Sequence, residues 1–125
     1  MRTMTETLSL EASIKLQSKM PEKTEYKWYI PHGWIRLVEW NENCWENWED
    51  NQIYKTLTLT EAIDMLPETI KKDLRLWDSY CKIMKHNWLY VVSYWAIVEK
   101  EWIECIFAVE KMLLYLDKEW LLPNK

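Results

Sequence analysis

The chain has few of the residues on which several common functions depend. It contains a single glycine, Gly33, among 125 residues. A glycine-rich loop that cradles phosphates therefore cannot form, which excludes P-loop and Rossmann nucleotide binding. Cysteine is also scarce, because Cys44, Cys81 and Cys105 are the only three and follow no motif spacing. An odd number of cysteines in this arrangement indicates free thiols in a reducing compartment.

Histidine is scarcer still, and the residue patterns of common catalytic or metal sites are missing. His32 and His86 are the only histidines, and the sequence has no CxxC, HxxxH or HExxH motif. Cys81 and Cys105 fall in apolar patterns that are typical of core thiols, whereas Cys44 is expected to be exposed. No carboxylate pair is flanked by the apolar residues that raise a pKa for acid catalysis. We predict a non-enzymatic protein with no catalytic residue, no metal and no cofactor.

Long hydrophobic runs are absent as well. The most apolar run, Trp88–Val98, spans eleven residues, whereas a membrane-spanning helix needs about 20. The N-terminal residues lack the apolar region of a signal peptide. We therefore expect no membrane association and a cytoplasmic location. The net charge of −4 disfavours non-specific binding to phosphate backbones.

Aromatic residues are abundant, with ten tryptophans and seven tyrosines in a chain that is 49% hydrophobic. This composition and length predict one globular domain over residues 1–125, with an aromatic core and some rings left at the surface. The segment "YKWYIPHGWIRLVEW" at 26–40 resembles "YCKIMKHNWLYVVSY" at 80–94. The match predicts two repeat units, 7–40 and 56–98, although chance similarity of helix-then-hairpin patterns is an alternative.

Each unit is expected to be a short helix followed by a β-hairpin. Thr7 or Ser9 in the first unit, and Thr58 or Thr60 in the second, offer hydroxyls that cap the helix. Pro67 limits the length of the second helix.

The hairpin turns are expected at Gly33 and Asn87, which both tolerate positive φ. Residues 88–98 are apolar on both faces, which indicates a central strand.

The last segment, 99–122, is predicted to form one amphipathic helix. Its apolar residues recur at steps of three and four, and the repeating positions are Trp102, Ile106, Val109, Leu113, Leu116 and Trp120. We expect this helix to cover the sheet, so that Trp102→Ala or Leu113→Ala would cost several kcal/mol. A helix–helix dimer seam is the alternative, which leaves open a monomer or a homodimer. The predicted fold class is α+β, with two tandem helix–β-hairpin units forming one mostly antiparallel sheet under the C-terminal helix.

The connector 41–55 joins the two units and is acidic and rich in tryptophan. Two functions fit its acids and rings: soluble lids over the sheet, or a partner-binding epitope in which carboxylates steer the encounter and tryptophans anchor the complex. Such a loop has the chemistry to occupy a basic nucleic-acid groove, because carboxylates replace phosphates and indoles replace stacked bases. The predicted partner-binding residues are Glu42, Trp45, Glu46, Trp48, Glu49 and Asp50.

A basic surface is the alternative binding site, and it is predicted at Lys71, Lys72, Arg75, Lys82 and Lys85. Lysines beside aromatic residues in both hairpins are also typical of a base-stacking platform for single-stranded RNA or DNA. Alternate residues of a strand face opposite sides, so only half of these rings can serve such a platform.

Three segments over residues 56–122 carry a resemblance to a known class of proteins. They are "LTLTEAIDMLPETI", the hairpin ending "WLYVVSYW" and the terminal "LDKEWLL". Together they resemble small accessory proteins of phages and prophages of the anti-defence, anti-CRISPR type. The resemblance implies an inhibitor that binds a host protein or a ribonucleoprotein nuclease complex. It transfers no catalytic residue.

Overall fold

The computed structural model describes residues 6–31, 34–40, 52–70, 79–95 and 97–122. The fold is α+β, as predicted, with helices and antiparallel strands in the described part of the chain. Its elements in chain order are α1 (Leu10–Lys15), the 3-10 helix η1 (Gln17–Lys19), β1 (Tyr26–Ile30), β2 (Arg36–Glu39), β3 (Gln52–Thr56), α2 (Leu59–Met65), β4 (Thr69–Ile70), β5 (Ser79–His86), β6 (Leu89–Tyr94), β7 (Val98–Trp102) and α3 (Cys105–Lys118).

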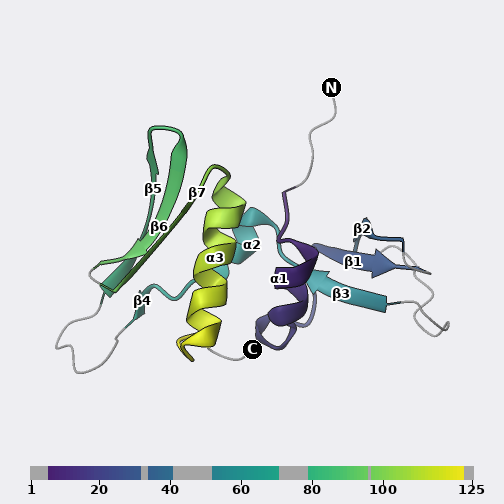
Figure 1. Ribbon diagram of the computed structural model, residues 1–125. Coiled ribbons are helices and arrows are strands. Elements are labelled where there is room, and N and C mark those ends of the chain that lie inside the picture. Colours follow the sequence, from purple (N-terminus) through teal and green to yellow (C-terminus); the bar gives the residue numbers. More distant parts are fainter. Residues whose placement is uncertain (1–5, 32–33, 41–51, 71–78, 96, 123–125) are drawn as a thin grey trace.

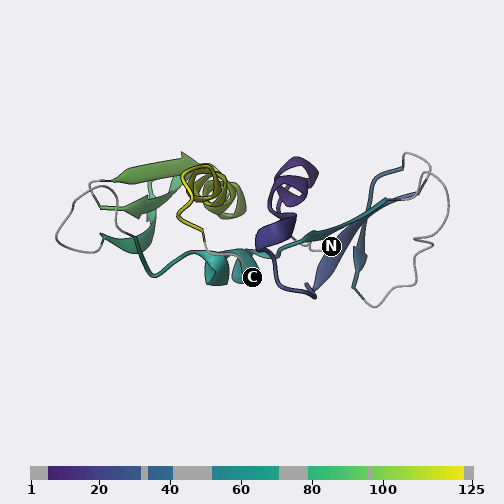
Figure 2. The same ribbon diagram turned by 90° about the horizontal axis from the view of Figure 1, so that it is seen from below.

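The strands form two antiparallel sheets, so the prediction of a single sheet is wrong. The first sheet has the order β2-β1-β3 and the second has the order β4-β5-β6-β7. The two sheets lie at opposite ends of the molecule, with α1, α2 and α3 between them (Figures 1 and 2). Each predicted hairpin forms as expected, but each pairs with additional strands of its own rather than with the other hairpin.

The first sheet is completed by residues that we had assigned to the connector 41–55. Its last residues form β3, which pairs with β1 so that Trp28 lies between Leu37 and Tyr54. Ser9 caps α1, because its side chain accepts a hydrogen bond from the backbone N–H of Ala12 at 3.2 Å. Ser9 is therefore the cap that the sequence had left open between two residues.

The second unit begins with the helix α2, which is capped by Thr58. The Thr58 hydroxyl and the Glu61 side chain form a reciprocal capping box. The helix ends at Met65, two residues before Pro67, as predicted. The β5–β6 turn contains Asn87 with a φ of 57°, which confirms the residue that we expected to adopt positive φ.

The helix α3 is shorter than the predicted helix 99–122. Residues 99–102 belong to β7 instead, where Glu101 pairs with Val91 and Glu99 pairs with Ser93 of the central strand β6. The charge alternation of Glu99, Lys100 and Glu101 has the period of a strand, and the β6 ladder satisfies the backbone groups of this segment. Trp120 lies beyond the other end of the helix with a φ of 60°.

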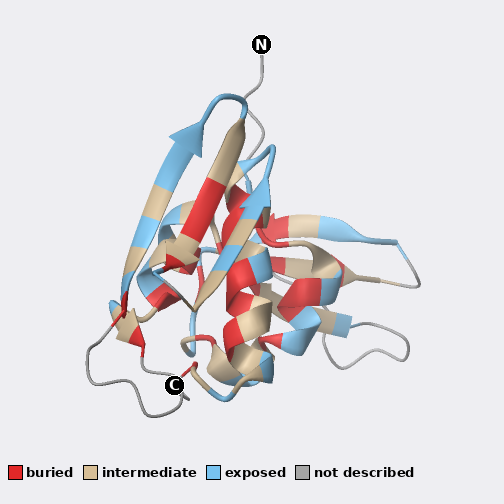
Figure 3. Ribbon diagram, turned by 60° about the vertical axis from the view of Figure 1, so that its left-hand side comes forward, coloured by how far each residue is buried: buried red, intermediate tan, exposed pale blue. Residues whose placement is uncertain are grey.

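The hydrophobic core lies between the helices and the inner side of β5 and β6 (Figure 3). The helix α3 packs against β6, β7 and α2. Leu113 is fully buried, as predicted, whereas Trp102 is 44% exposed and therefore lies outside the core, which corrects the expected apolar seam. The fully buried apolar residues include Leu8, Leu16, Leu57, Val92, Tyr94, Ile106, Met112, Leu113 and Leu116.

Candidate functional site

Most of the predicted binding residues lie outside the described residues. The acidic and aromatic set Glu42, Trp45, Glu46, Trp48, Glu49 and Asp50 falls in the segment 41–51, and so does Cys44. Three residues of the alternative basic surface, Lys71, Lys72 and Arg75, fall in the segment 71–78. Both sets remain predictions.

The two remaining residues of the basic surface, Lys82 and Lys85, do not form one surface. They are three positions apart on β5 and therefore point to opposite faces of the second sheet. Lys82 pairs with Ser93 across the ladder, whereas Lys85 pairs with Tyr90. Lys85 shares its face with α3, and Lys82 lies on the face away from this helix.

The two described thiols, Cys81 and Cys105, are partly buried. Burial raises the pKa of both Cys81 and Cys105, which keeps these thiols protonated. Burial also raises the pKa of Tyr94, whose hydroxyl donates a hydrogen bond to the carbonyl of Pro67 at 2.6 Å. His86 ends β5 and is exposed, next to the turn where we expected it.

The described residues contain neither a metal-binding cluster nor a membrane-spanning helix. Among these residues, no group of three or more His, Cys, Asp or Glu side chains is arranged to hold a metal ion. Nor does any helix in the described ranges have the length and apolar character needed to cross a membrane.

Exposed tryptophans are the most prominent feature of the described surface. Trp34 follows the β1–β2 turn and is 76% exposed, and Trp88 lies in the β5–β6 turn and is 65% exposed. Trp95, Trp102 and Trp120 are exposed as well. The matching "HGW" and "HNW" segments predict the turns but not the exposure of their tryptophans. The alternation of residues along a strand does not determine whether a ring at the tip of a hairpin is exposed.

A second feature is a row of lysines and aromatic rings on the α3 side of the second sheet, which we call the lysine–aromatic strip. Its cations stack on its rings, with Lys111 Nζ 3.9 Å from the Trp102 ring centroid and Lys100 Nζ 5.1 Å from that of Tyr115. Tyr90 of β6 and Trp102 of β7 are register partners. They therefore connect Lys85, which lies over Tyr90, with Lys111, which lies over Trp102. The strip consists of Lys85, Tyr90, Lys100, Trp102, Lys111, Tyr115 and Lys118.

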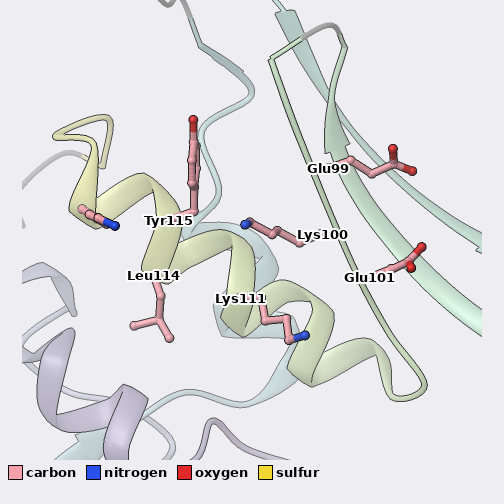
Figure 4. A pocket seen from close by; sticks show the side chains of 7 residues that line it. Glu99, Lys100, Glu101, Lys111, Leu114 and Tyr115 are labelled. Atoms are coloured by element: carbon pink, nitrogen blue, oxygen red, sulfur yellow. The ribbon is translucent and has the colours of Figure 1, made fainter.

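Four residues of the strip, Lys100, Lys111, Tyr115 and Lys118, line a groove of about 560 Å³ between β7 and α3. Lys111, Tyr115 and Lys118 follow one another along one side of α3, and Lys100 points toward them from β7 (Figure 4). Glu99 and Glu101 also border the groove, but their carboxylates point away from the helix. The ion pairs formed among the described residues involve none of the three lysines. This arrangement is suited to binding anions and planar groups.

The strip was missed by reasoning from the sequence because four different elements supply its residues. In addition, Lys100 and Trp102 had been assigned to a helix, in which they would not share a side with Tyr90. The one signal available was the proximity of lysines to aromatic residues in "YCKIMKHNW".

Comparison of the chain with protein-family models, with curated proteins and with solved structures finds no match.

Proposed function

We propose that this is a non-enzymatic binding protein of the inhibitor type, which acts on a host protein or a ribonucleoprotein nuclease complex. The observation that carries this proposal is the exposure of a tryptophan at the tip of each hairpin, Trp34 and Trp88. A tryptophan left in water gives up the large apolar area that it gains by burial, and tryptophan is among the residues most enriched in interface hot spots.

The position of the two tips favours a large partner. The β1–β2 tip and the β5–β6 tip lie far apart on the molecule (Figure 1). Ile35 is 59% exposed beside Trp34, which enlarges the apolar area at the first tip. A small ligand reaches one tip only, whereas a multi-subunit complex is large enough to contact both. A nuclease complex of the kind implied by the sequence resemblance has this size.

The acidic connector remains part of this proposal. Glu46→Lys combined with Glu49→Lys is expected mainly to slow association and to weaken its salt dependence, because charges at the rim of an interface steer the encounter. Trp48→Ala is expected mainly to speed dissociation. If Trp48→Ala instead destabilises the free protein and leaves binding intact, the tryptophans of the connector are lids rather than an epitope.

The proposal is tested by capture followed by an activity assay. Immobilised protein is incubated with bacterial extract, the retained proteins are identified by mass spectrometry, and nuclease activity of the retained complex is measured on a labelled target. We expect one complex to be retained and its activity to fall when free protein is added.

The matched variants decide whether the hairpin tips are responsible. Trp34→Ala with Trp88→Ala should abolish capture, whereas Trp120→Ala, which removes an even more exposed ring outside the hairpins, should not. Capture that survives the double substitution contradicts the proposal.

Binding of single-stranded RNA or DNA is a second candidate function, and the lysine–aromatic strip specifically favours it. Single-strand binding combines a cationic groove that follows the backbone with aromatic rings on which bases stack. The groove beside Lys100, Lys111 and Lys118 has the first property, and the neighbouring Tyr90 and Trp102 rings provide the second.

Fluorescence anisotropy of a labelled 12-nucleotide strand over a series of salt concentrations tests this candidate. Lys111→Gln should lower the slope of log affinity against log salt by about 0.7, since one phosphate contact is lost. Lys82→Gln, on the opposite face of the second sheet, should leave the slope unchanged. A protein that fails to bind the strand at low salt does not have this function.

A further inference from the structure

The second sheet has a face that its covering helix leaves open. Residues on the inner face, such as Ile83, Val92 and Val98, pack in or against the core below α3. The alternate residues point to the other side, which we call the outer face. Its residues are Tyr80, Lys82, Met84, His86, Leu89, Val91, Ser93, Glu99 and Glu101, and Figure 3 shows the strands that carry them, coloured by burial.

The strand register arranges the outer face into rows that cross the sheet from β5 to β7. One row consists of Lys82 on β5, Ser93 on β6 and Glu99 on β7, and the next consists of Met84, Val91 and Glu101. The central strand is thus neutral, whereas the lysine and the glutamates occupy opposite sides of it.

Lys82 and Glu99 do not form an ion pair with each other within one molecule. They lie two strand spacings apart, which is about 10 Å. Neither side chain takes part in an ion pair formed among the described residues. Each charge is therefore available to a group brought from outside.

We propose that the outer face binds the outer face of a second copy of this chain. The two-fold axis lies between the two faces and runs parallel to β6. Rotation by 180° about such an axis exchanges the β5 edge with the β7 edge. Lys82 then faces Glu99 of the partner subunit, and the same contact occurs a second time on the other side of the axis. Ser93, which is partly exposed, lies next to the axis opposite its own copy, whereas Val91 is already buried within one molecule.

A second copy fits this face better than an unrelated protein, because the row Lys82–Ser93–Glu99 is its own complement in charge. The same rotation places Met84 beside Glu101 of the partner subunit. A contact around a two-fold axis requires that a surface match itself after rotation. The row Lys82–Ser93–Glu99 meets that requirement, since a neutral centre separates opposite charges at equal distances. Two sheets packed face to face lie about 10 Å apart, which would also bury the exposed rings and side chains of Tyr80 and Met84.

Charge reversal provides a sharp test by sedimentation equilibrium, with the full-length protein as the sample. The wild-type protein is expected to form a dimer. Lys82→Glu places two like-charged pairs in the interface and should raise the dissociation constant of the dimer at least tenfold. Glu99→Lys should do the same through two pairs of lysines. Higher salt should weaken the wild-type dimer and should strengthen association of each single variant.

Mixing the two variants distinguishes this interface from any other. An equimolar mixture of the Lys82→Glu and Glu99→Lys proteins restores opposite charges at both contacts, so a heterodimer should form that neither protein forms alone. The double variant should likewise recover the wild-type dissociation constant. Lys23→Glu and Glu22→Lys make the same changes of net charge at exposed positions outside the outer face, and both should leave the dimer intact.

Two results overturn the proposal. One is a wild-type protein that stays monomeric at about 100 μM, in which case the face is free for a different partner. The other is a dimer that the single charge reversals leave unchanged, which would place the interface elsewhere. Thermal unfolding followed by circular dichroism shows whether each variant is folded, and a variant that fails this check is replaced by Lys82→Gln or Glu99→Gln, for which a smaller weakening is expected.

Discussion

The two sheets begin from the same sequence pattern but are stabilised differently. In the first sheet, the hairpin β1–β2 is extended by β3, and its nearest helix, α1, has six residues. In the second sheet, the hairpin β5–β6 lies between β4 and β7 and packs under the 14-residue helix α3. Val92 and Tyr94 of the second sheet belong to the main core, whereas Tyr29 and Val38 of the first sheet are buried outside it.

The comparison teaches that a repeated local pattern specifies hairpins but not their surroundings. A hairpin forms from neighbouring residues and needs only a suitable turn and alternation. Its further partners depend on residues distant in the chain, and those differ between the units. The second unit is followed by the long helix α3, which packs on its sheet. We therefore expect the second sheet and α3 to contribute most of the free energy of folding.

The largest effect is expected from the core under α3. Leu113→Ala removes a fully buried side chain and should lower the free energy of unfolding by about 3 kcal/mol, because the cavity it leaves cannot collapse completely. Val38→Ala in the first sheet should cost less, about 1.5 kcal/mol, since fewer buried groups are lost. Urea denaturation measures both. A larger loss for Val38→Ala would reverse the proposed distribution of stability.

A smaller effect is expected at the helix caps, where the two units can be compared directly. Thr58→Ala removes a capping box and should cost about 1 kcal/mol, and Ser9→Ala should cost the same or less. Thr60→Ala is the matched control, because Thr60 is the exposed second residue of the same helix and is not its N-cap. If thermal unfolding shows equal losses for Thr58→Ala and Thr60→Ala, the capping assignment is wrong.

The substitution Trp102→Ala is expected to cost about 1 kcal/mol, far less than the sequence pattern had indicated. The ring is 44% exposed, and the main interaction that it loses is the stacking with Lys111 at 3.9 Å. Lys111→Met keeps most of the aliphatic contact and removes the charge, so it separates packing from the cation–π interaction. If Trp102→Ala lowers the free energy of unfolding by several kcal/mol, this side chain contributes to the core after all.

The smallest effect concerns pH and the buried thiol of the second sheet. Burial raises the pKa of Cys81 in the folded protein above its ordinary value of 9.0. The folded state therefore holds this proton more tightly than the unfolded state does. The resulting stability is complete below about pH 9 and is lost as the pH rises through the folded pKa. Cys81→Ala should flatten the decline of unfolding free energy above pH 9, and an unchanged decline would exclude this thiol as a cause.

Much of the fold was predictable from the sequence, because local physics decides it. Ser9 and Thr58 cap helices through contacts three residues away, and Asn87 allows the turn by its own conformational preference. The separation into two sheets was not predictable in this way. It depends on which hairpin residues 52–56 and 98–102 join, and a short strand with mixed charges carries little information about its partner.

The candidate sites show the same limit. The connector and most of the basic surface were proposed from residues adjacent in the chain. The lysine–aromatic strip, in contrast, brings Lys85 of β5 together with Trp102 of β7 and Lys111 of α3. No sequence window contains these residues, so only the sheet register and the position of α3 bring them to one surface.

The central claim is that the exposed tryptophans at the hairpin tips bind a partner while α3 and its core hold the fold. The most direct test measures two quantities for Trp88→Ala, its unfolding free energy in urea and the dissociation rate of the captured complex by surface plasmon resonance. We predict a change below about 0.5 kcal/mol in unfolding, as for an exposed position. Dissociation should become roughly 30-fold faster, which corresponds to about 2 kcal/mol for a hot spot. A destabilised protein that releases its partner at the wild-type rate would contradict the claim.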